Sequence, residues 1–388
     1  MKSADLPLLF VPGILGTTLV DRSNPGRAVW GSAGGLLALR KHSFTKGAAG
    51  ENGLAPGEVL WKFGVIAGLY SIPVYEDLAL RLATIGYDRA RLTAPVTARA
   101  LYGLSYDWRK DVVGGARELE AAVEHLKTKL GVPRVAFLAH SWGCHVVRYY
   151  LRYGGADLLS DAPEDPRPGE TNALSFFALG PLAGGTLRAL HEANHGFPVA
   201  PLRLGIAARQ AARTPSLYQM LPFDEDRVVD EEGHPMDLDL SDVETWRTRA
   251  WGPFQPEAMR EQGPPRVEEF LANCLRRARR LWELLRERHP SDERVRTHTY
   301  TVCDARTLTK LVLATGGRTF ASNEEVARHC KHLLPLVTSP GDGYVSLEDV
   351  RRHIPGNLVS VEGCSHRHLY RNDEVLDDLI RNLGGETR

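Results

Sequence analysis

Short runs of apolar residues alternate along the chain with longer segments whose apolar positions have helical spacing. The apolar runs predict strands, and they cover residues 6–11, 134–138, 173–179, 295–303 and 358–361. The helical patterns cover residues 116–130, 267–288 and 373–383. Strands that alternate with helices are typical of a mostly parallel sheet covered by helices, so the sequence predicts an α/β protein.

Two regions interrupt this alternation. Residues 26–73 are rich in Gly and Ala and offer no strong period, and residues 187–262 contain many prolines and an acidic stretch. Long insertions in an α/β enzyme commonly form lids or caps over a substrate site. We therefore expect one domain over residues 1–388, with a lid-like insertion at 26–73 and a cap insertion at 187–262.

Charge and composition narrow the classes of function. The chain of 388 residues has 48 Lys and Arg against 48 Asp and Glu. This zero balance argues against nucleic acid as a partner, because phosphate binding usually requires a strongly basic surface. No apolar run reaches the roughly 18 residues of a membrane-spanning helix, and the first residues lack a charged leader with a cleavage site. We expect a cytoplasmic protein with no integral membrane segment.

The strongest chemical signal lies between an apolar run and a helical pattern. Residues 135–147 read VAFLAHSWGCHVV, with Ser141 at the centre of the turn. This is the nucleophile elbow G-x-S-x-G, with Ala139 in the first Gly position. Small flanking residues allow the sharp turn that exposes the hydroxyl, and the backbone N–H of Trp142 can then face a developing oxyanion. Ser141 is therefore a candidate nucleophile.

A serine hydroxyl needs a base and an orienting carboxylate to react near neutral pH. On a fold with this elbow, the acid and then the His follow the Ser along the chain. Asp342 lies in a Gly-flanked loop and His366 follows the last predicted strand, so both can reach the sheet edge that carries Ser141. Asp304 remains an alternative acid, and His368 an alternative base.

The second oxyanion donor is expected in a loop after an early strand. Gly13 and Gly16 follow the strand predicted at 6–11 and let the backbone turn its N–H groups inward. Ile14 is the preferred donor, with Leu15 possible. The segment lacks the Lys of a P-loop and the spacing of a dinucleotide fingerprint, which argues against phosphate binding.

Several segments together carry a family resemblance. They are FVPGILG (10–16), YDWR (106–109), AHSWG (139–143), LGPLAGG (179–185), GDG (341–343) and SH (365–366). In this order the chain resembles the lecithin:cholesterol acyltransferase family, including bacterial lipase-like members. The resemblance implies an α/β-hydrolase fold, a triad of Ser141, Asp342 and His366, an oxyanion hole from Ile14 and Trp142, caps over the site, and acyl esters as substrates. The chain departs from the family at Ala139 and lacks the cysteines that bracket the lid of animal members.

A second motif suggests different chemistry. The residues from His191 to His195 match H-E-x-x-H, in which two His one helical turn apart bind zinc and the Glu activates water. A Gly and a Pro end the helix directly afterwards, and no third His follows nearby. The sequence therefore favours a solvated helix end, and we expect no metal among the site residues.

The sequence as a whole predicts a serine hydrolase or acyltransferase that acts on lipid-like or other acyl esters without a cofactor. Leu15, Trp30, Trp61, Leu217 and Tyr218 are candidate substrate-binding residues, because apolar lid and cap positions can form an acyl site. A thioesterase or amidase with the same triad remains open. A metal-dependent hydrolase built on His191 and His195, and a non-catalytic lipid-binding protein, are more distant alternatives.

Overall fold

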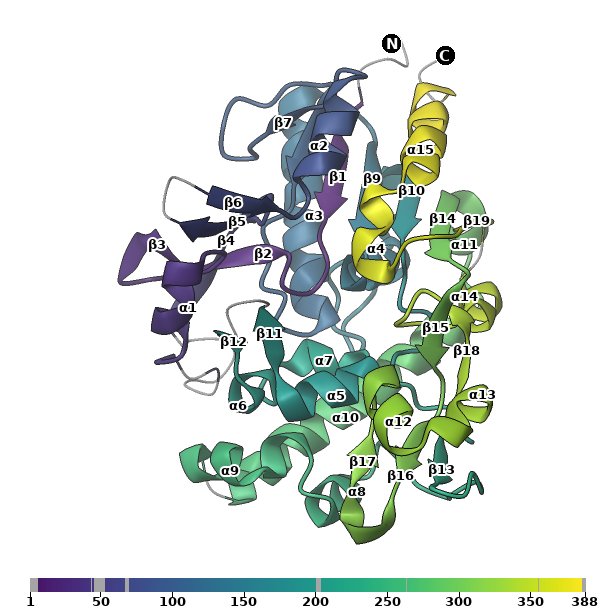
Figure 1. Ribbon diagram of the computed structural model, residues 1–388. Coiled ribbons are helices and arrows are strands. Elements are labelled where there is room, and N and C mark those ends of the chain that lie inside the picture. Colours follow the sequence, from purple (N-terminus) through teal and green to yellow (C-terminus); the bar gives the residue numbers. More distant parts are fainter. Residues whose placement is uncertain are drawn as a thin grey trace.

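A parallel sheet forms the centre of the protein. The computed structural model describes residues 6–42, 44, 53–66, 70–199, 204–262, 264–354 and 356–385. Within these ranges, seven strands pair in the order β19-β14-β10-β9-β1-β8-β7 (Figure 1), and every neighbouring pair is parallel. They are β1 (Leu8–Val11), β7 (Asp88–Ala90), β8 (Ala100–Gly103), β9 (Val135–His140), β10 (Ala173–Leu179), β14 (Arg296–Val302) and β19 (Asn357–Val361). The predicted α/β-hydrolase fold is confirmed.

The five predicted strands all form, with ends within two residues of those expected. They were detectable because both faces of this sheet are buried, which produces uninterrupted apolar runs. Along β9, Val135 and Phe137 pack into one core while Ala136 and Leu138 pack into the other. The sequence missed two strands of this sheet, β8, which has only four residues, and β7, a short edge strand whose first two residues are exposed.

Helices cover both faces of the sheet. The cluster on one face includes apolar residues of α3 (Val112–Leu130) and α4 (Trp142–Tyr153). The cluster on the other includes residues of α2 (Glu76–Ala83) and α15 (Asp373–Gly385). The carboxylate of Asp111 caps the start of α3 by accepting from the Gly114 N–H, at 3.2 Å, so the helix begins four residues before its predicted start.

The segment expected to be a lid forms small antiparallel sheets beside the central one. Its elements, with the strand before them, are β2 (Thr17–Asp21), β3 (Asn24–Trp30), α1 (Ala33–Leu39), β4 (Leu54–Val59), β5 (Lys62–Ile66) and β6 (Tyr70–Pro73). Residues 43, 45–52 and 67–69 of this segment lie outside the described residues. A lid function for 26–73 stays a prediction.

Short elements make up the region expected to be a cap. They are α5 (Arg188–His195), β11 (Phe197–Val199), β12 (Leu204–Ile206), α6 (Ala208–Ala211), α7 (Pro215–Gln219), β13 (Val228–Asp230), α8 (Val243–Thr248), η2 (Gly252–Phe254) and α9 (Pro256–Gln262). In Figure 1 these teal and green elements gather below the central sheet. The long helix α10 (Pro264–Arg286), predicted at 267–288, follows them. Residues 200–203 lie outside the described residues.

The remaining elements connect the later strands. They are η1 (Gly169–Asn172), α11 (Ser291–Arg294), β15 (Ala305–Leu308), β16 (Leu311–Leu313), η3 (Thr315–Gly317), β17 (Thr319–Phe320), α12 (Asn323–His329), η4 (Lys331–Leu333), α13 (Leu334–Val337), β18 (Thr338–Gly341), α14 (Leu347–His353) and η5 (His366–Arg371). Among the described residues, no helix combines the length and the apolar character that crossing a membrane requires.

Candidate active site

Ser141 occupies a strained turn between β9 and α4. Its φ of +55° and ψ of −124° lie in a region that non-glycine residues rarely adopt. The turn also needs a glycine at position 143, because a Cβ there would meet the Val11 carbonyl oxygen at 2.3 Å. Ala139 is fully buried and replaces the first Gly of the motif in the strand before the turn. The local geometry is that of a nucleophile elbow.

Three polar side chains from distant parts of the chain meet at this turn. His366 Nε2 lies 2.8 Å from Ser141 Oγ, and His366 Nδ1 lies 2.6 Å from Asp342 Oδ2. Ser141 is 6% exposed, His366 2% and Asp342 1%, so water has little access to the hydrogen bonds that join them. Both imidazole nitrogens are therefore engaged, one with a hydroxyl and one with a carboxylate.

The backbone fixes the acid and the imidazole relative to each other. Asp342 follows β18, which pairs with β15, and the His366 N–H donates to the Asp342 carbonyl oxygen at 3.0 Å. Asp342 Oδ1 accepts from the N–H groups of Tyr344 and Val345, each at 2.8 Å, which leaves Oδ2 for His366. The loop thus holds the carboxylate in one orientation before any substrate binds.

The two alternative residues point elsewhere. Asp304 accepts a hydrogen bond from the Gly363 N–H at 2.9 Å, so it orders the loop after β19. His368 Nδ1 pairs with the Ser365 hydroxyl at 3.0 Å. The structure brings Asp342 and His366 to Ser141, while Asp304 and His368 support the loop around them.

Charge and hydrogen bonding keep Asp342 ionised despite its burial. Burial alone would raise the pKa of the carboxyl, because it penalises the charged form. The charge and the hydrogen bond of His366, together with the two backbone N–H donors, outweigh burial and lower the pKa below its ordinary value. A carboxylate is therefore present to orient His366 at neutral pH.

The loop after β1 lies directly against the serine. A Cβ at Gly13 would come within 3.0 Å of the Ser141 Cβ. The Gly16 N–H donates to the Gly13 carbonyl oxygen at 3.0 Å, and Leu15 has a φ of +65°, as in a type II turn. The hydrogen bond that closes this turn does not involve the Ile14 N–H. The Trp142 N–H, in the first turn of α4, also has no acceptor within the helix.

The segment from Tyr106 to Arg109 supports this loop. The Tyr106 hydroxyl donates to the Pro12 carbonyl oxygen at 2.7 Å, and the Trp108 indole N–H donates to the Thr17 carbonyl oxygen at 2.9 Å. Asp107 and Arg109 form a buried bidentate pair, with distances of 2.8 and 2.7 Å. Two bonds from this motif therefore hold both ends of the loop that faces Ser141.

Two residues that the sequence did not single out adjoin the site. The hydroxyl of Tyr75 lies 3.2 Å from the Gly13 N–H and 2.9 Å from His140 Nδ1, and His140 Nε2 lies 3.1 Å from the His366 carbonyl oxygen. Burial lowers the pKa of His140 to about 3, so this imidazole is neutral at neutral pH. The available signal was a His at the end of an otherwise apolar strand, directly before the candidate nucleophile.

The other side of His366 is covered by an aromatic ring. Tyr344 stacks on the imidazole, with ring centroids 4.4 Å apart and an angle of 23° between the planes. Its hydroxyl accepts from Arg367 at 2.9 and 2.6 Å. Glu192, on α5, lies 3.6 Å from both Arg367 and Arg188. The central Glu of the H-E-x-x-H motif therefore belongs to a polar group beside His366.

The candidate substrate-binding residues lie in different environments. The Trp30 indole N–H donates to the Leu15 carbonyl oxygen at 2.8 Å, which places both beside the loop after β1. Trp61 is partly buried, packs near Phe10, and has the Arg89 guanidinium 5.5 Å from its ring. Leu217 and Tyr218 are buried within the cap core. Substrate binding by these five residues stays a prediction.

Comparison with known proteins agrees with the motif order. Residues 60–244 match the family model of lecithin:cholesterol acyltransferase. The resemblance seen in the sequence is confirmed over this segment, which contains Ser141 and Trp142. The family match supports an enzyme of the esterase or lipase type. No curated protein matches the sequence.

Solved structures resemble the chain at low sequence identity. The crystal structure of the Tle4-Tli4 complex contains a chain that is 13% identical, with a TM-score of 0.56 and 98% of each chain covered. The mature form of the Bacillus licheniformis lipase BlEst2 is 11% identical, with a TM-score of 0.45, covering 98% of this chain and 92% of the lipase. At 13% identity, the first likeness concerns the fold alone.

Proposed function

We propose that the protein is a serine-dependent acyl ester hydrolase or acyltransferase, with Ser141 as nucleophile, His366 as base and Asp342 as orienting acid. The observation that supports this most strongly is the continuous hydrogen-bonded chain from Ser141 Oγ through His366 to Asp342, at 2.8 and 2.6 Å, at a strained elbow. A hydroxyl in this setting gains a proton acceptor at hydrogen-bond distance, which an isolated serine lacks.

The geometry supports the following reaction. His366 Nε2 takes the proton of Ser141 as the oxygen attacks an ester carbonyl carbon, and Asp342 stabilises the imidazolium that forms. The N–H groups of Ile14 and Trp142 bind the oxyanion of the tetrahedral intermediate; one such donor is worth about 3–4 kcal/mol of barrier. His366 then protonates the leaving alcohol, and an acyl-enzyme remains. Water or a second alcohol releases the acyl group by the reverse sequence of steps.

The cover over the site supports a role for the two insertions. Ser141 and His366 are nearly buried, so a substrate reaches Ser141 only after some covering segment moves. Trp30, from the first insertion, contacts the loop after β1 through Leu15, and Glu192, from the second, contacts Tyr344. We assign residues 26–73 as a lid and residues 187–262 as a cap. Closure over an acyl-enzyme would limit the entry of water and favour transfer to an alcohol.

A panel of acyl donors tests this proposal. The purified protein is given esters, thioesters, amides and phospholipids of graded chain length, with and without an alcohol acceptor. We expect turnover of esters that falls to background in Ser141→Ala and is unchanged in Ser23→Ala, where an exposed serine is replaced. An acyl-alcohol product would indicate transfer. Ester turnover that survives Ser141→Ala would refute the serine mechanism.

A further inference from the structure

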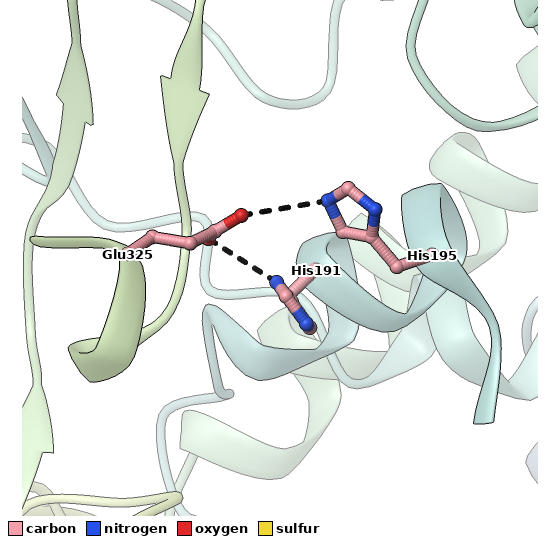
Figure 2. A group of neighbouring side chains, drawn as sticks. All are labelled: His191, His195 and Glu325. Atoms are coloured by element: carbon pink, nitrogen blue, oxygen red, sulfur yellow. Dashed lines mark hydrogen bonds and ion pairs between the residues drawn. The ribbon is translucent and has the colours of Figure 1, made fainter. Parts of the chain in front are cut away.

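Three side chains with metal-binding chemistry, none of them in the proposed triad, lie close together, as Figure 2 shows. His191 and His195 lie one turn apart on α5, and Glu325 lies on α12. Glu325 Oε2 is 3.2 Å from His191 Nδ1, and Glu325 Oε1 is 3.5 Å from His195 Nε2. One ligand atom from each residue can be chosen so that all three lie within 4.8 Å of one another. Both imidazoles therefore turn toward one carboxylate.

The distances between Glu325 and the two imidazoles are close to those of a small metal ion with tetrahedral coordination. Zinc binds imidazole nitrogen and carboxylate oxygen at about 2.0–2.2 Å in tetrahedral sites, which places neighbouring ligand atoms about 3.4 Å apart. Each imidazole has one oxygen of Glu325 near this spacing, Oε2 at 3.2 Å from His191 and Oε1 at 3.5 Å from His195. A shift of the side chains from their separation of up to 4.8 Å would bring all three ligand atoms to the spacing of one site. A water molecule would complete the coordination.

Neighbouring groups hold the carboxylate in place. Glu325 Oε2 accepts from the Ala321 N–H at 3.0 Å and from the Ser322 hydroxyl at 3.1 Å. Such outer contacts commonly orient the ligands of metal sites. The side chain of His195 is 55% exposed, which provides access from solvent.

The arrangement differs from that of a zinc protease. In that mechanism the Glu after the first His activates the metal-bound water. Here Glu192 is 5% exposed and lies 3.6 Å from both Arg188 and Arg367, in the polar group beside His366. The third candidate ligand, Glu325, lies on α12, 130 residues after His195 in the sequence. The cluster is therefore suited to holding two helices together.

We propose that His191, His195 and Glu325 bind one divalent transition-metal ion of the zinc class, which cross-links α5 to α12. The other face of α5 carries Glu192, which contacts Arg367 next to the Tyr344 ring that stacks on His366. Metal binding restrains this helix and stabilises the wall beside the catalytic imidazole. The inference stands apart from the serine chemistry, because no residue of the proposed triad is a ligand.

A second group of possible ligands is explained without a metal. Asp230, Glu232 and His234 also lie close together. Asp230 Oδ1 accepts from the N–H groups of Glu232 and His234 at 3.0 and 2.8 Å, so this carboxylate orders its own turn. The side chain of His234 is 76% exposed. His234 therefore provides a matched control for His195.

Direct metal binding tests the proposal. The full chain is stripped with a chelator, freed of it, and titrated with Zn²⁺ by calorimetry and with Co²⁺ by visible absorption. We expect one equivalent to bind, with a four-coordinate Co²⁺ spectrum, and the affinity to fall by at least about tenfold in His195→Ala and Glu325→Gln. His234→Ala and Ser141→Ala should bind as the wild type does. Zn²⁺ should raise the Tm of the wild type but not that of Glu325→Gln.

Two results would overturn the site. One is equal Zn²⁺ affinity in the wild type and in Glu325→Gln, with the folding of both verified by their Tm in chelator. The other is a loss of binding in His234→Ala alone, which would place the ion in the other group. Because Ser141→Ala retains the ligands, failure of the serine mechanism and failure of this site are separate outcomes.

Discussion

His140 donates a hydrogen bond from Nε2 to the backbone carbonyl oxygen of His366, at 3.1 Å. A carbonyl oxygen only accepts, so the proton of the neutral imidazole resides on Nε2 and Nδ1 is an acceptor. The Tyr75 hydroxyl then donates to Nδ1, and its oxygen accepts from the Gly13 N–H. This chain connects the loop expected to bind the oxyanion with the loop that carries the proposed base.

Replacing Tyr75 by Phe tests this connection. The variant leaves the Gly13 N–H and His140 Nδ1 without their partner in a buried region, which should cost about 1–3 kcal/mol of unfolding free energy. Both loops lose a restraint, so kcat should fall about tenfold to a hundredfold while KM changes little. Urea unfolding and steady-state kinetics measure the two effects.

Tyr149→Phe is the control for this variant. It removes a buried hydroxyl that donates to the Ala156 carbonyl oxygen at 2.7 Å, beyond the far end of α4 from Ser141. We expect a similar loss of stability with an unchanged kcat. A wild-type kcat in Tyr75→Phe would contradict the positioning role of the chain.

Asp342→Asn separates the orientation of His366 from the folding of its loop. The amide oxygen can still accept from the N–H groups of Tyr344 and Val345, so the fold should be retained. The amide NH₂ facing His366 Nδ1 favours the wrong tautomer, and kcat should fall by about 10⁴. Asp304→Asn, at the alternative acid, should retain activity. Comparable losses in both variants would contradict the assignment of Asp342.

Stability should fall as the pH is lowered. Burial lowers the pKa of His140 and of His145 to about 3, against an ordinary value of about 6.5 in the unfolded chain. Between these values the unfolded chain binds protons that the folded protein does not. The contribution of these two His residues to the free energy of unfolding is therefore complete above pH 6.5. It declines toward pH 3, by up to about 1.4 kcal/mol per pH unit for each His. Urea unfolding across this range measures the slope.

His145→Gln should reduce this slope, because it removes one of the two imidazoles whose pKa burial lowers to about 3. His145 lies on α4 between Trp142 and Trp282, with ring centroids at 5.6 and 5.2 Å, and its side chain belongs to none of the proposed catalytic contacts. An identical slope in the variant would contradict the assignment of the pH dependence to these groups.

A buried ion pair anchors the elbow helix α4 to α11, and the same guanidinium also reaches α10. The Arg152 side chain is 0% exposed, and its guanidinium donates to both Asp292 oxygens, at 2.9 and 2.6 Å, and to the Leu284 carbonyl oxygen at 2.8 Å. Asp292→Ala leaves this charge without its counter-ion and should cost about 3–5 kcal/mol. Glu164→Ala, which removes an exposed partner of Arg117, should cost less than about 1 kcal/mol. Chemical unfolding compares the two.

The sequence predicted the parts of the site that local patterns specify. β9 is buried on both faces, so it is a continuous apolar run, and Ser141 and Gly143 follow it at fixed spacing. Asp342 and His366 were placed by chain order and by the ends of predicted strands. The structure brings both to Ser141, and their catalytic role is what the experiments must decide.

Contacts between distant segments could not be predicted in the same way. Tyr75 meets His140 across 65 positions, and His191 meets Glu325 across 134. Neither pair leaves a periodic signal, because each depends on how whole elements pack. The sequence therefore favoured a solvated end for α5, whereas α12 places a carboxylate against both of its His side chains.

Covalent labelling of the folded protein by a fluorophosphonate, located by peptide mass spectrometry, tests the central claim most directly. The account predicts one adduct, on Ser141, that is lost in Ser141→Ala and forms far more slowly in His366→Gln. Undiminished labelling of Ser141→Ala, or an adduct on another residue, would contradict it.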